Sequence, residues 1–258
     1  MNDTMKKNFH DALRKGVRRD GRALTQFRDI EIEYGVSSTS HGSARVKAGN
    51  AEIIAGVKID VGAPYPDTPD EGSLMVSTEM LPLSHRKFEG GPPGIDSIEA
   101  ARVVDRTIRE SKAMDLKGLC IEQGEKIWFV AVDLMPVSYD GNMIDLGVIA
   151  AMAALQDARL PKLDEDGRPL LEELSDEKLP LNELPIAVTV FKYADQYLID
   201  PSEVEERAYD ARLTIGSLAN GHLCSLQKGG EGPLTVEDIE HMFDLGVSTA
   251  QDLRKHFQ

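Results

Sequence analysis

One segment restricts the possible folds more than any other: the helix predicted over residues 144–159, which has almost no polar face. Much of it consists of small residues, namely Ala150, Ala151, Ala153 and Ala154. A helix with one polar face can lie on the surface of a protein, but a helix that is apolar all round must be buried on several sides. The chain must therefore build layers around this helix.

Strands on both sides of this helix in the sequence can supply those layers. Alternating or short continuous apolar runs predict strands over residues 28–36, 42–50, 51–62, 73–84, 117–124, 126–138, 185–195, 197–201, 210–217 and 222–229. Further helices are predicted over 7–16, over 97–114 and from Thr235, where Asp238 completes a capping box. This order predicts an α/β or α+β fold whose sheets are covered by helices.

Two segments lack a regular pattern. Residues 85–94, HRKFEGGPPG, hold two prolines and three glycines, which exclude regular structure. Residues 161–183 predict an acidic connecting loop of weak order. We therefore expect one unit over residues 1–258, with an N-terminal half at about 20–160 and a C-terminal half at 184–255.

The net charge of −15 over 258 residues argues against a freestanding nucleic-acid binder, because contacts to phosphates supply most non-specific affinity. Basic residues nevertheless gather near the start of the chain: Lys6, Lys7, Arg14, Lys15, Arg18, Arg19, Arg22 and Arg28. This cluster predicts either a basic surface used toward RNA or an acidic partner, or a solvated basic helix.

Composition also gives expectations about location and thiols. No stretch approaches the roughly 20 apolar residues that span a bilayer, and the N-terminus lacks the apolar core of a signal peptide. The chain is therefore expected in the cytoplasm. Cys120 and Cys224 lie in apolar strand-like runs without metal-ligand spacing, which predicts buried free thiols.

Common catalytic signatures are absent from the sequence. It contains no nucleotide-binding glycine loop, no GxSxG and no HExxH, and its six histidines never fall at ligand spacing. No metal or cofactor is therefore expected. Five carboxylates lie between residues 200 and 210, namely Asp200, Glu203, Glu205, Glu206 and Asp210. They could perform acid–base chemistry, although such a run is more typical of a solvated loop.

The helix predicted over 97–114 carries a stripe of arginines. Arg102, Arg106 and Arg109 lie at i, i+4 and i+7, so they share one face. The opposite side, expected to face the core, holds Ile98, Ala101, Val104 and Ile108. Three adjacent guanidinium groups repel one another unless an anion or acidic side chains lie opposite. The stripe either faces an external anion or is neutralised by Asp105 and Glu110.

The turn before the apolar helix, Asp140-Gly141-Asn142, resembles an anion site. Backbone N–H groups and the positive end of the helix dipole converge at such a turn. A working site usually adds an arginine or a lysine. Here the next residues are Met143, Ile144 and Asp145, and Asp145 is itself an anion. The turn is either an ordinary one or an anion site that has lost its charge.

Several segments resemble one known family, the RNase PH superfamily of phosphorolytic exoribonucleases. RRDGR at 18–22 followed by Arg28 is similar to its N-terminal signature, and GSARVKAGNAEIIAGVKID to the strand pair that follows there. The resemblance continues through LPLSHRKFEGGPPG, IEAARVVDRTIRESKAMDL, YDGNMIDLGVIAAMAALQDARLP, IDPSEVEERAYDARLTI and SLQKGGEGPLT. It covers nearly the whole chain, and its details are most similar to the non-catalytic ring subunits of the archaeal exosome.

The resemblance implies an RNase PH fold, which is ribosomal protein S5 domain 2-like, and an inactive subunit. Active members place Gly-Ser/Thr-Arg in the turn, whereas this chain has Gly141, Asn142, Met143 and Ile144 there, a degenerate phosphate site. The arginine pair that active members carry before the long helix is replaced by Gly94-Ile95-Asp96. Asp210 matches the catalytic aspartate and would be its relic. Phosphorolysis depends on cationic clamping of phosphate, so no catalytic residue is expected.

The resemblance also implies partners. The chain would pair with a catalytic RNase PH-like paralogue, and three such pairs would form a hexameric ring with RNA-binding cap subunits. It would complete the paralogue's active site and help to bind single-stranded RNA through Arg102, Arg106 and Arg109. Two alternatives stay open: an active phosphate-dependent 3′–5′ exoribonuclease that uses Asp210, and a small-molecule enzyme on a related scaffold.

Overall fold

The larger of the two main sheets forms one side of the molecule. The computed structural model describes residues 3–166 and 168–257. The strands of this sheet are β1 (Ile30–Tyr34), β2 (Gly42–Ala48), β3 (Ala51–Gly62), β4 (Ser73–Thr78), β5 (Cys120–Glu122) and β6 (Lys126–Ser138). Their order is β1-β2-β3-β6-β4, with β5 also paired to β6. All neighbours are antiparallel except β4 and β6, which run parallel because α2 connects β4 to the later strands.

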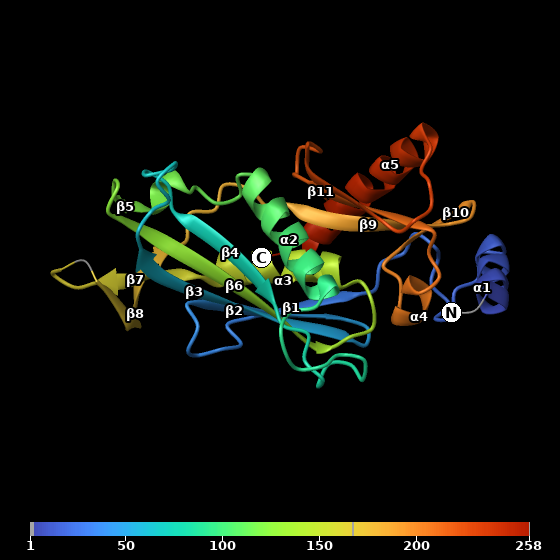
Figure 1. Cartoon of the computed structure of the whole chain (residues 1–258), viewed down its shortest axis with the longest axis horizontal. Coiled ribbons are helices and arrows are strands. Elements are labelled where there is room, and N and C mark those ends of the chain that lie inside the picture. Colours follow the sequence, from blue (N-terminus) through green and yellow to red (C-terminus); the bar gives the residue numbers. More distant parts are fainter. Residues whose placement is uncertain (1–2, 167, 258) are drawn as a thin grey trace.

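The apolar helix lies at the centre, as expected. It is α3 (Met143–Asp157), and twelve of its residues are buried. It packs on β2 and β3 of the larger sheet, on β9 of the second sheet and on α2 (Ile95–Glu110). Figure 1 shows α2 and α3 between the two sheets. Because α3 is covered from several sides, it has no need of a polar face.

The second sheet and its helices complete the fold. Its strands are β9 (Ile186–Tyr193), β10 (Gln196–Ile199), β11 (Ala211–Ser217) and β12 (Leu223–Gly229), in the order β10-β9-β11-β12. Helix α5 (Val236–Leu253) packs on β9 and β11. Its N-terminus has the expected capping box between Thr235 and Asp238. One continuous hydrophobic cluster joins residues of both sheets through α3.

Two short elements lie at the far end of the molecule (Figure 1). Helix α1 (Asp3–Arg14) packs through Leu13 against a small separate cluster with Phe191, Tyr193 and Leu198. Helix α4 (Glu203–Glu206) follows β10 and begins with a capping box between Ser202 and Glu205. Single 3₁₀ turns cover Lys117–Leu119 and Arg254–His256.

The expectation of a loop over residues 161–183 is wrong. Strands β7 (Arg159–Leu163) and β8 (Pro169–Lys178) pair there as an antiparallel hairpin that projects from the body (Figure 1). Gly167 of this segment lies outside the described residues. The Asp164 carboxylate builds the turn, because its Oδ1 accepts hydrogen bonds from the N–H groups of Asp166 and Arg168. Within β7 the buried residues Leu160 and Pro161 are adjacent, so they give no apolar alternation and the sequence resembles that of a loop.

Smaller corrections concern helix α2. It ends at Glu110 rather than Met114, and Ile98 is 48% exposed instead of facing the core. The buried face consists of Ser97, Ala100, Val103, Val104, Thr107 and Ile108. Ser97 and Thr107 complete this face with hydrogen bonds, to the Thr78 carbonyl and to Ser225 respectively. A pattern based on apolar residues alone could not find them. Cys120 and Cys224 are free thiols, as expected, but each is only partly buried.

Two glycines on neighbouring strands test how tightly α3 packs on the sheet. A Cβ on Gly42 would lie 2.5 Å from the Ala154 carbonyl oxygen and 2.5 Å from the Ala158 Cα, whereas a Cβ on Gly56 would meet nothing within 4 Å. Gly42→Ala should therefore lower the free energy of unfolding by about 2–3 kcal/mol through overpacking. Gly56→Ala is the matched control and should change it by less than about 1 kcal/mol. Urea unfolding measures both; equal losses would show that α3 can move away from β2.

Candidate functional site

The turn before α3 has two successive residues in the left-handed conformation. Gly141 has a φ of +81° and Asn142 a φ of +60°, so both residues are left-handed. Asparagine tolerates this conformation better than most residues, and glycine is free to adopt it. A Cβ on Gly141 would also lie 2.4 Å from the Pro201 carbonyl oxygen. The turn is therefore pressed against the segment that leads into α4.

A carboxylate of the same chain, that of Glu206, is hydrogen-bonded to the backbone N–H of Asn142 in this turn. Glu206, on α4, accepts a hydrogen bond from the Asn142 N–H at 2.7 Å and another from the Tyr139 hydroxyl at 2.5 Å. Burial raises the pKa of Glu206, although these two hydrogen bonds act in the opposite direction. A carboxylate at a helix N-terminus is stabilised by the same N–H group and dipole that would bind a phosphate. At this amide an external anion would have to displace Glu206.

A second carboxylate, that of Asp200, joins the turn to the N-terminal segment. It is 0% exposed. Its Oδ1 accepts from Arg28 Nη2 at 2.6 Å and from Asn142 Nδ2 at 2.9 Å, and its Oδ2 accepts from Arg22 Nη1 at 2.7 Å. Burial alone would raise the pKa of Asp200, but hydrogen bonds and charge from Arg28 outweigh it and lower this pKa. Asp200 is therefore an ionised, fully paired anchor.

Arg18 forms a parallel anchor. Its side chain is 0% exposed and binds Glu205 in a bidentate pair, with nitrogen–oxygen distances of 3.1 and 2.7 Å. It also donates to the carbonyl oxygens of Ile199 and Asp200. Both readings of the basic N-terminus are thus wrong for Arg18, Arg22 and Arg28, which neither face an external partner nor stay solvated. The preference for a solvated loop is equally wrong for Asp200 and Glu205, because these arginines bury them.

Asp145, in the first turn of α3, is also buried completely. Its two oxygens accept hydrogen bonds from the Thr189 N–H at 2.8 Å and the Thr189 hydroxyl at 2.6 Å. Burial raises the pKa of Asp145 to about 7, and the charge of Asp200 adds to this, against the effect of Thr189. The acidic residue in the turn sequence thus faces the second sheet and joins α3 to β9.

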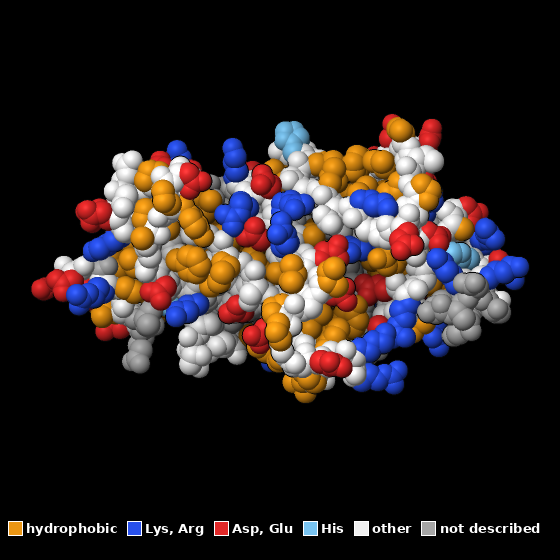
Figure 2. Space-filling model, viewed as in Figure 1, with side chains coloured by type: hydrophobic (Ala, Val, Ile, Leu, Met, Phe, Trp, Pro, Cys, Tyr) orange, Lys and Arg blue, Asp and Glu red, His pale blue; other side chains and the backbone are white. Residues whose placement is uncertain are grey.

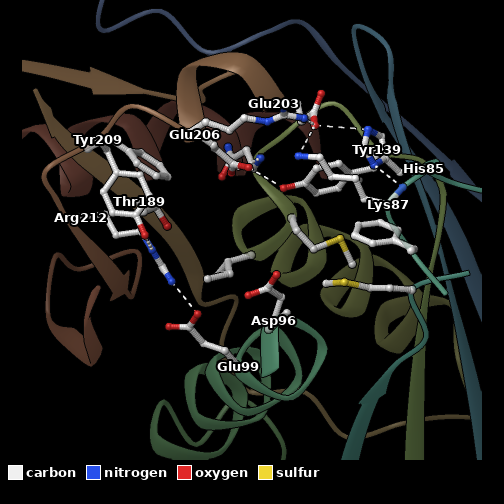
Figure 3. Close-up of a pocket in the computed structure, with 18 residues that line it drawn as sticks. His85, Lys87, Asp96, Glu99, Tyr139, Thr189, Glu203, Glu206, Tyr209 and Arg212 are labelled. Atoms are coloured by element: carbon white, nitrogen blue, oxygen red, sulfur yellow. Dashed lines mark hydrogen bonds and ion pairs between the residues drawn. The ribbon is translucent and has the colours of Figure 1, made fainter. Parts of the chain in front are cut away.

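A cavity of about 270 Å³ lies over the turn (Figure 3). Asn142, Met143 and Ile144 form part of its lining, together with residues of α2, α4, β9, β11 and the 80–88 loop. At its rim Glu203 pairs with His85 and Lys87 at 3.3 Å each, and also with Arg207. On the other side Arg212 pairs with Glu99 at 2.6 Å. Lys87, Arg207 and Arg212 are therefore each bound to a carboxylate of the chain.

Comparison with known proteins shows which family the chain belongs to. The model of the 3′ exoribonuclease family, domain 1, matches residues 26–161, and that of domain 2 matches residues 183–249. The chain belongs to the 3′ exoribonuclease (RNase PH) family. Similar relatives are the Exosome complex component Rrp42 of Methanothermobacter thermautotrophicus, at 43% identity over 96% of this chain and 92% of that protein, and that of Methanopyrus kandleri, at 42% identity over 95% and 92%.

Solved structures agree with this assignment. A chain of the Archaeoglobus fulgidus exosome with RNA bound to the active site is 40% identical, with a TM-score of 0.91 over 99% of this chain and 98% of that one. Rice Rrp46 is 19% identical, with a TM-score of 0.69 over 92% and 97%, and is similar in fold alone. The RNase PH fold and the α/β class expected from the sequence are confirmed.

Asp210, which the resemblance matches to the catalytic aspartate, does not line the cavity within the described residues. Asp210 pairs with Lys6 of α1 at 2.7 Å, and its Oδ2 accepts from the Ala194 N–H at 2.7 Å. Burial opposes ionisation, but the hydrogen bond from Lys6 helps to lower the pKa of Asp210. It does not belong to the described residues that line the cavity. The structure therefore brings Asn142, Met143 and Ile144 to one cavity but places Asp210 against α1.

The three arginines of α2 lie together, as the spacing predicts. Arg102, Arg106 and Arg109 line one surface groove of about 380 Å³ beside β4, and Figure 2 shows basic side chains gathered over α2. Arg109 binds Asp105 at 2.7 Å and the Leu74 carbonyl at 2.7 Å, so it is neutralised. Arg106 makes one long hydrogen bond, to Gln227 at 3.4 Å. Arg102 is exposed and has no partner within the described part of the chain.

Sequence patterns singled out Asp200 and Glu206 as members of an acidic run but missed their contacts with the turn. Their signal was present as acidic residues in IDPSEVEERAYD, but only the fold brings them to the turn, about 60 positions away along the chain. Among residues 3–166 and 168–257 no group of three or more His, Cys, Asp or Glu side chains is arranged to hold a metal ion. Over the same ranges no helix combines the length and apolar run needed to cross a membrane.

The Asp200 anchor predicts a large loss of stability when it is removed. Asp200→Ala should lower the free energy of unfolding by about 3–5 kcal/mol, because it leaves Arg22 and Arg28 buried without their counter-charge. Asp195→Ala removes a carboxylate from an exposed pair with Arg14 and should have a far smaller effect. Chemical denaturation measures both variants. Similar small losses would show that water reaches the arginines and replaces Asp200.

Asp145 predicts a dependence of stability on pH. Its folded pKa is raised from 3.8 to about 7, so the folded state binds a proton more tightly than the unfolded state. The resulting stabilisation is complete below the unfolded pKa and is lost as the pH rises through about 7. Between pH 5 and 8, roughly the window this linkage implies, wild-type stability should fall relative to Asp145→Asn, which cannot titrate. Parallel curves for the two proteins would contradict this assignment.

Proposed function

We propose that this chain is a non-catalytic ring subunit of a phosphorolytic RNA-degrading exosome. One observation carries the absence of catalysis: the carboxylate of Glu206 occupies the Asn142 amide at the N-terminus of α3. The chain is similar to exosome components over nearly its whole length, and this similarity supports the assignment to that complex. We propose that the chain takes part in RNA degradation as one subunit of this assembly. We also propose that the assembly is located in the cytoplasm.

The electrostatics of the site argue against phosphorolysis. The reaction needs preorganised cations around inorganic phosphate and the transferring phosphoryl group. In this chain Ile144 stands where the family's arginine is expected, and the cavity cations Lys87, Arg207 and Arg212 are bound to internal carboxylates. Glu206 adds negative charge at the very amide that would hold phosphate. A phosphate would meet repulsion in this site rather than a clamp.

The surface supports a role as a ring member. Strand β4 lies at the edge of the larger sheet: it pairs with β6 on one side, and among the described residues no strand pairs with its other side. Large apolar side chains are exposed on β4, α2 and β12, including Met75, Ile98 and Leu226. We propose that this surface packs against a catalytic RNase PH-like paralogue, that three such pairs close a hexameric ring, and that RNA-binding cap subunits sit on it.

The arginine groove gives the subunit a way to hold RNA. Arg102 and Arg106 keep charge available in the groove, while Arg109 is held by Asp105. We propose that the three arginines contact backbone phosphates of single-stranded RNA near its 3′ end and help to present it to the paralogue's active site. Confining basic charge to such a path agrees with a net charge of −15, which repels RNA elsewhere.

The first test of this proposal is activity. The purified chain should show no phosphate-dependent shortening of RNA, whereas the ring reconstituted with its catalytic paralogue should release nucleoside diphosphates. Asp210→Asn in that ring should leave activity within about twofold, because loss of a contact outside the reacting centre does not change transition-state stabilisation. The competing interpretation is an active enzyme that uses Asp210. It requires that the isolated chain be active, or that an intact Asp210→Asn ring lose its activity.

The arginine groove is tested by salt dependence. Arg102→Ala combined with Arg106→Ala should weaken RNA binding by the ring, similarly for all sequences, because phosphate contacts position a strand without reading its bases. The slope of log K against log salt should become shallower by roughly 0.7 for each phosphate contact removed. Lys58→Ala combined with Lys255→Ala is a control of equal charge change at exposed sites elsewhere. An unchanged slope would show that RNA does not bind in this groove. If the double variant no longer assembled into the ring, the arginines would belong to a subunit interface.

A further inference from the structure

Tyr65 differs from the other aromatic residues in its exposure. Its side chain is 63% exposed, whereas every other aromatic side chain in the described residues is at least partly buried. Within residues 3–166 and 168–257 its ring contacts no other aromatic ring. A single exposed apolar group is common on protein surfaces and needs no explanation by itself. The backbone that carries Tyr65 and the side chains beside it are what indicate a role.

The backbone around Tyr65 has little freedom. The residue lies between Pro64 and Pro66, in the loop that connects β3 to β4. Proline fixes its own φ and restricts the residue before it to extended conformations. The Tyr65 carbonyl also accepts a hydrogen bond from the Thr68 N–H at 3.1 Å. The loop therefore displays the ring at a defined place, and little entropy is lost when a ligand binds it.

Tyr65 lies beside one end of the arginine groove. Its loop leads directly into β4, and Arg109 of the groove donates to the carbonyl of Leu74, the second residue of that strand, at 2.7 Å. The hydrogen bond with Asp105 is the main cause that raises the pKa of Arg109, and Tyr65 is near enough to add to this effect through its charge. From Arg109 the row of arginines extends along α2 to Arg102, over about 10 Å.

A free aromatic ring next to a row of cations suits a single strand of nucleic acid. The cations hold the phosphates of the backbone, and the aromatic side chain stacks on a base. Such stacking tolerates any base, because every base has a π-face. Inorganic phosphate would meet the arginines alone, whereas a strand reaches the arginines and the ring together.

We propose that Tyr65 stacks on a base of the single-stranded RNA whose phosphates lie in the arginine groove. This inference rests on the proposed function, because it requires RNA in that groove, and it adds a contact that the arginines do not make. Contacts to phosphates alone let a protein slide along a strand. A base stacked on Tyr65 would oppose this sliding and hold the strand in register.

RNA binding by the ring reconstituted with its catalytic paralogue tests this contact. The two probes are single-stranded oligoadenylate and an abasic ribose-phosphate strand of the same length. Tyr65→Ala should weaken binding of oligoadenylate about tenfold, whereas Tyr65→Phe, which keeps the aromatic ring, should stay within about twofold of the wild type. Both variants should bind the abasic strand as the wild type does, because that strand has no base to stack.

Salt dependence separates stacking from a contact to phosphate. Tyr65→Ala removes no cation, so the slope of log K against log salt should not change. Arg102→Ala combined with Arg106→Ala should make the same slope shallower. Val17→Ala is the control for loss of an exposed apolar side chain, because Val17 is 56% exposed and follows α1. This control should change neither the affinity nor the slope.

Tyr65→Trp gives an optical readout of the same contact. The single tryptophan of the chain, Trp128, is 7% exposed, so a tryptophan at position 65 adds a signal from an exposed site. The fluorescence that this substitution adds to the ring should be quenched by oligoadenylate, because a base stacks on the indole. The abasic strand should leave it nearly unchanged.

Three results would overturn the stacking proposal. Tyr65→Phe might bind RNA as weakly as Tyr65→Ala, the abasic strand might show the same loss as oligoadenylate, or the Tyr65→Ala ring might fail to assemble. The third result would assign Tyr65 to a subunit interface.

The stacking proposal and the proposed function fail separately. If the arginine variant flattens the salt slope but Tyr65→Ala has no effect, only the stacking is wrong. If the slope does not depend on the arginines, yet Tyr65→Ala weakens binding only when bases are present, the stacking stands and the phosphate path is wrong. A ring that binds no RNA contradicts both proposals.

Discussion

The structure depends on one buried charge, the carboxylate of Asp200. A carboxylate taken out of water is costly unless strong partners replace its hydration. Asp200 finds them in Arg22, Arg28 and Asn142, which come from two segments far from it in the sequence. Because these partners bury one another, none of the segments can adopt its folded position alone. The N-terminal signature, the turn before α3 and the segment before α4 must take their positions together.

This anchor also determines the chemistry of the site. Asp200 and Glu205 place the short helix α4 beside the turn, and α4 in turn places Glu206 on the Asn142 amide. A carboxylate held by the fold has a high effective concentration at this amide, which free phosphate at cellular levels would have to exceed. In the proposed function, the missing arginine at position 144 is thus only half of the change. The other half is Glu206, an internal anion bound to the Asn142 amide.

The sequence predicted much of the fold and less of the site. The apolar α3, the paired strands β2 and β3 and the capping box of α5 have strong local patterns, because burial on known faces determines them. In the β7–β8 hairpin the buried residues of β7, Leu160 and Pro161, are adjacent and therefore give no alternating pattern. Glu205, which pairs with Arg18, and Asp200, which pairs with Arg28, lie more than 170 positions away from them, and no spacing rule connects such residues. The turn itself was recognisable, but its occupant Glu206 became visible only in three dimensions.

The shared core has a consequence for how the protein is made. Helix α3 is completed by residue 157, yet β9, which covers one of its sides, begins at residue 186. While the ribosome is still synthesising the second half, the emerging first half therefore exposes an apolar helix with no polar face. During translation this intermediate is a natural client for chaperones, because exposed apolar surface promotes aggregation. Emergence of β9, rather than completion of the first half, is the event that lets α3 be enclosed.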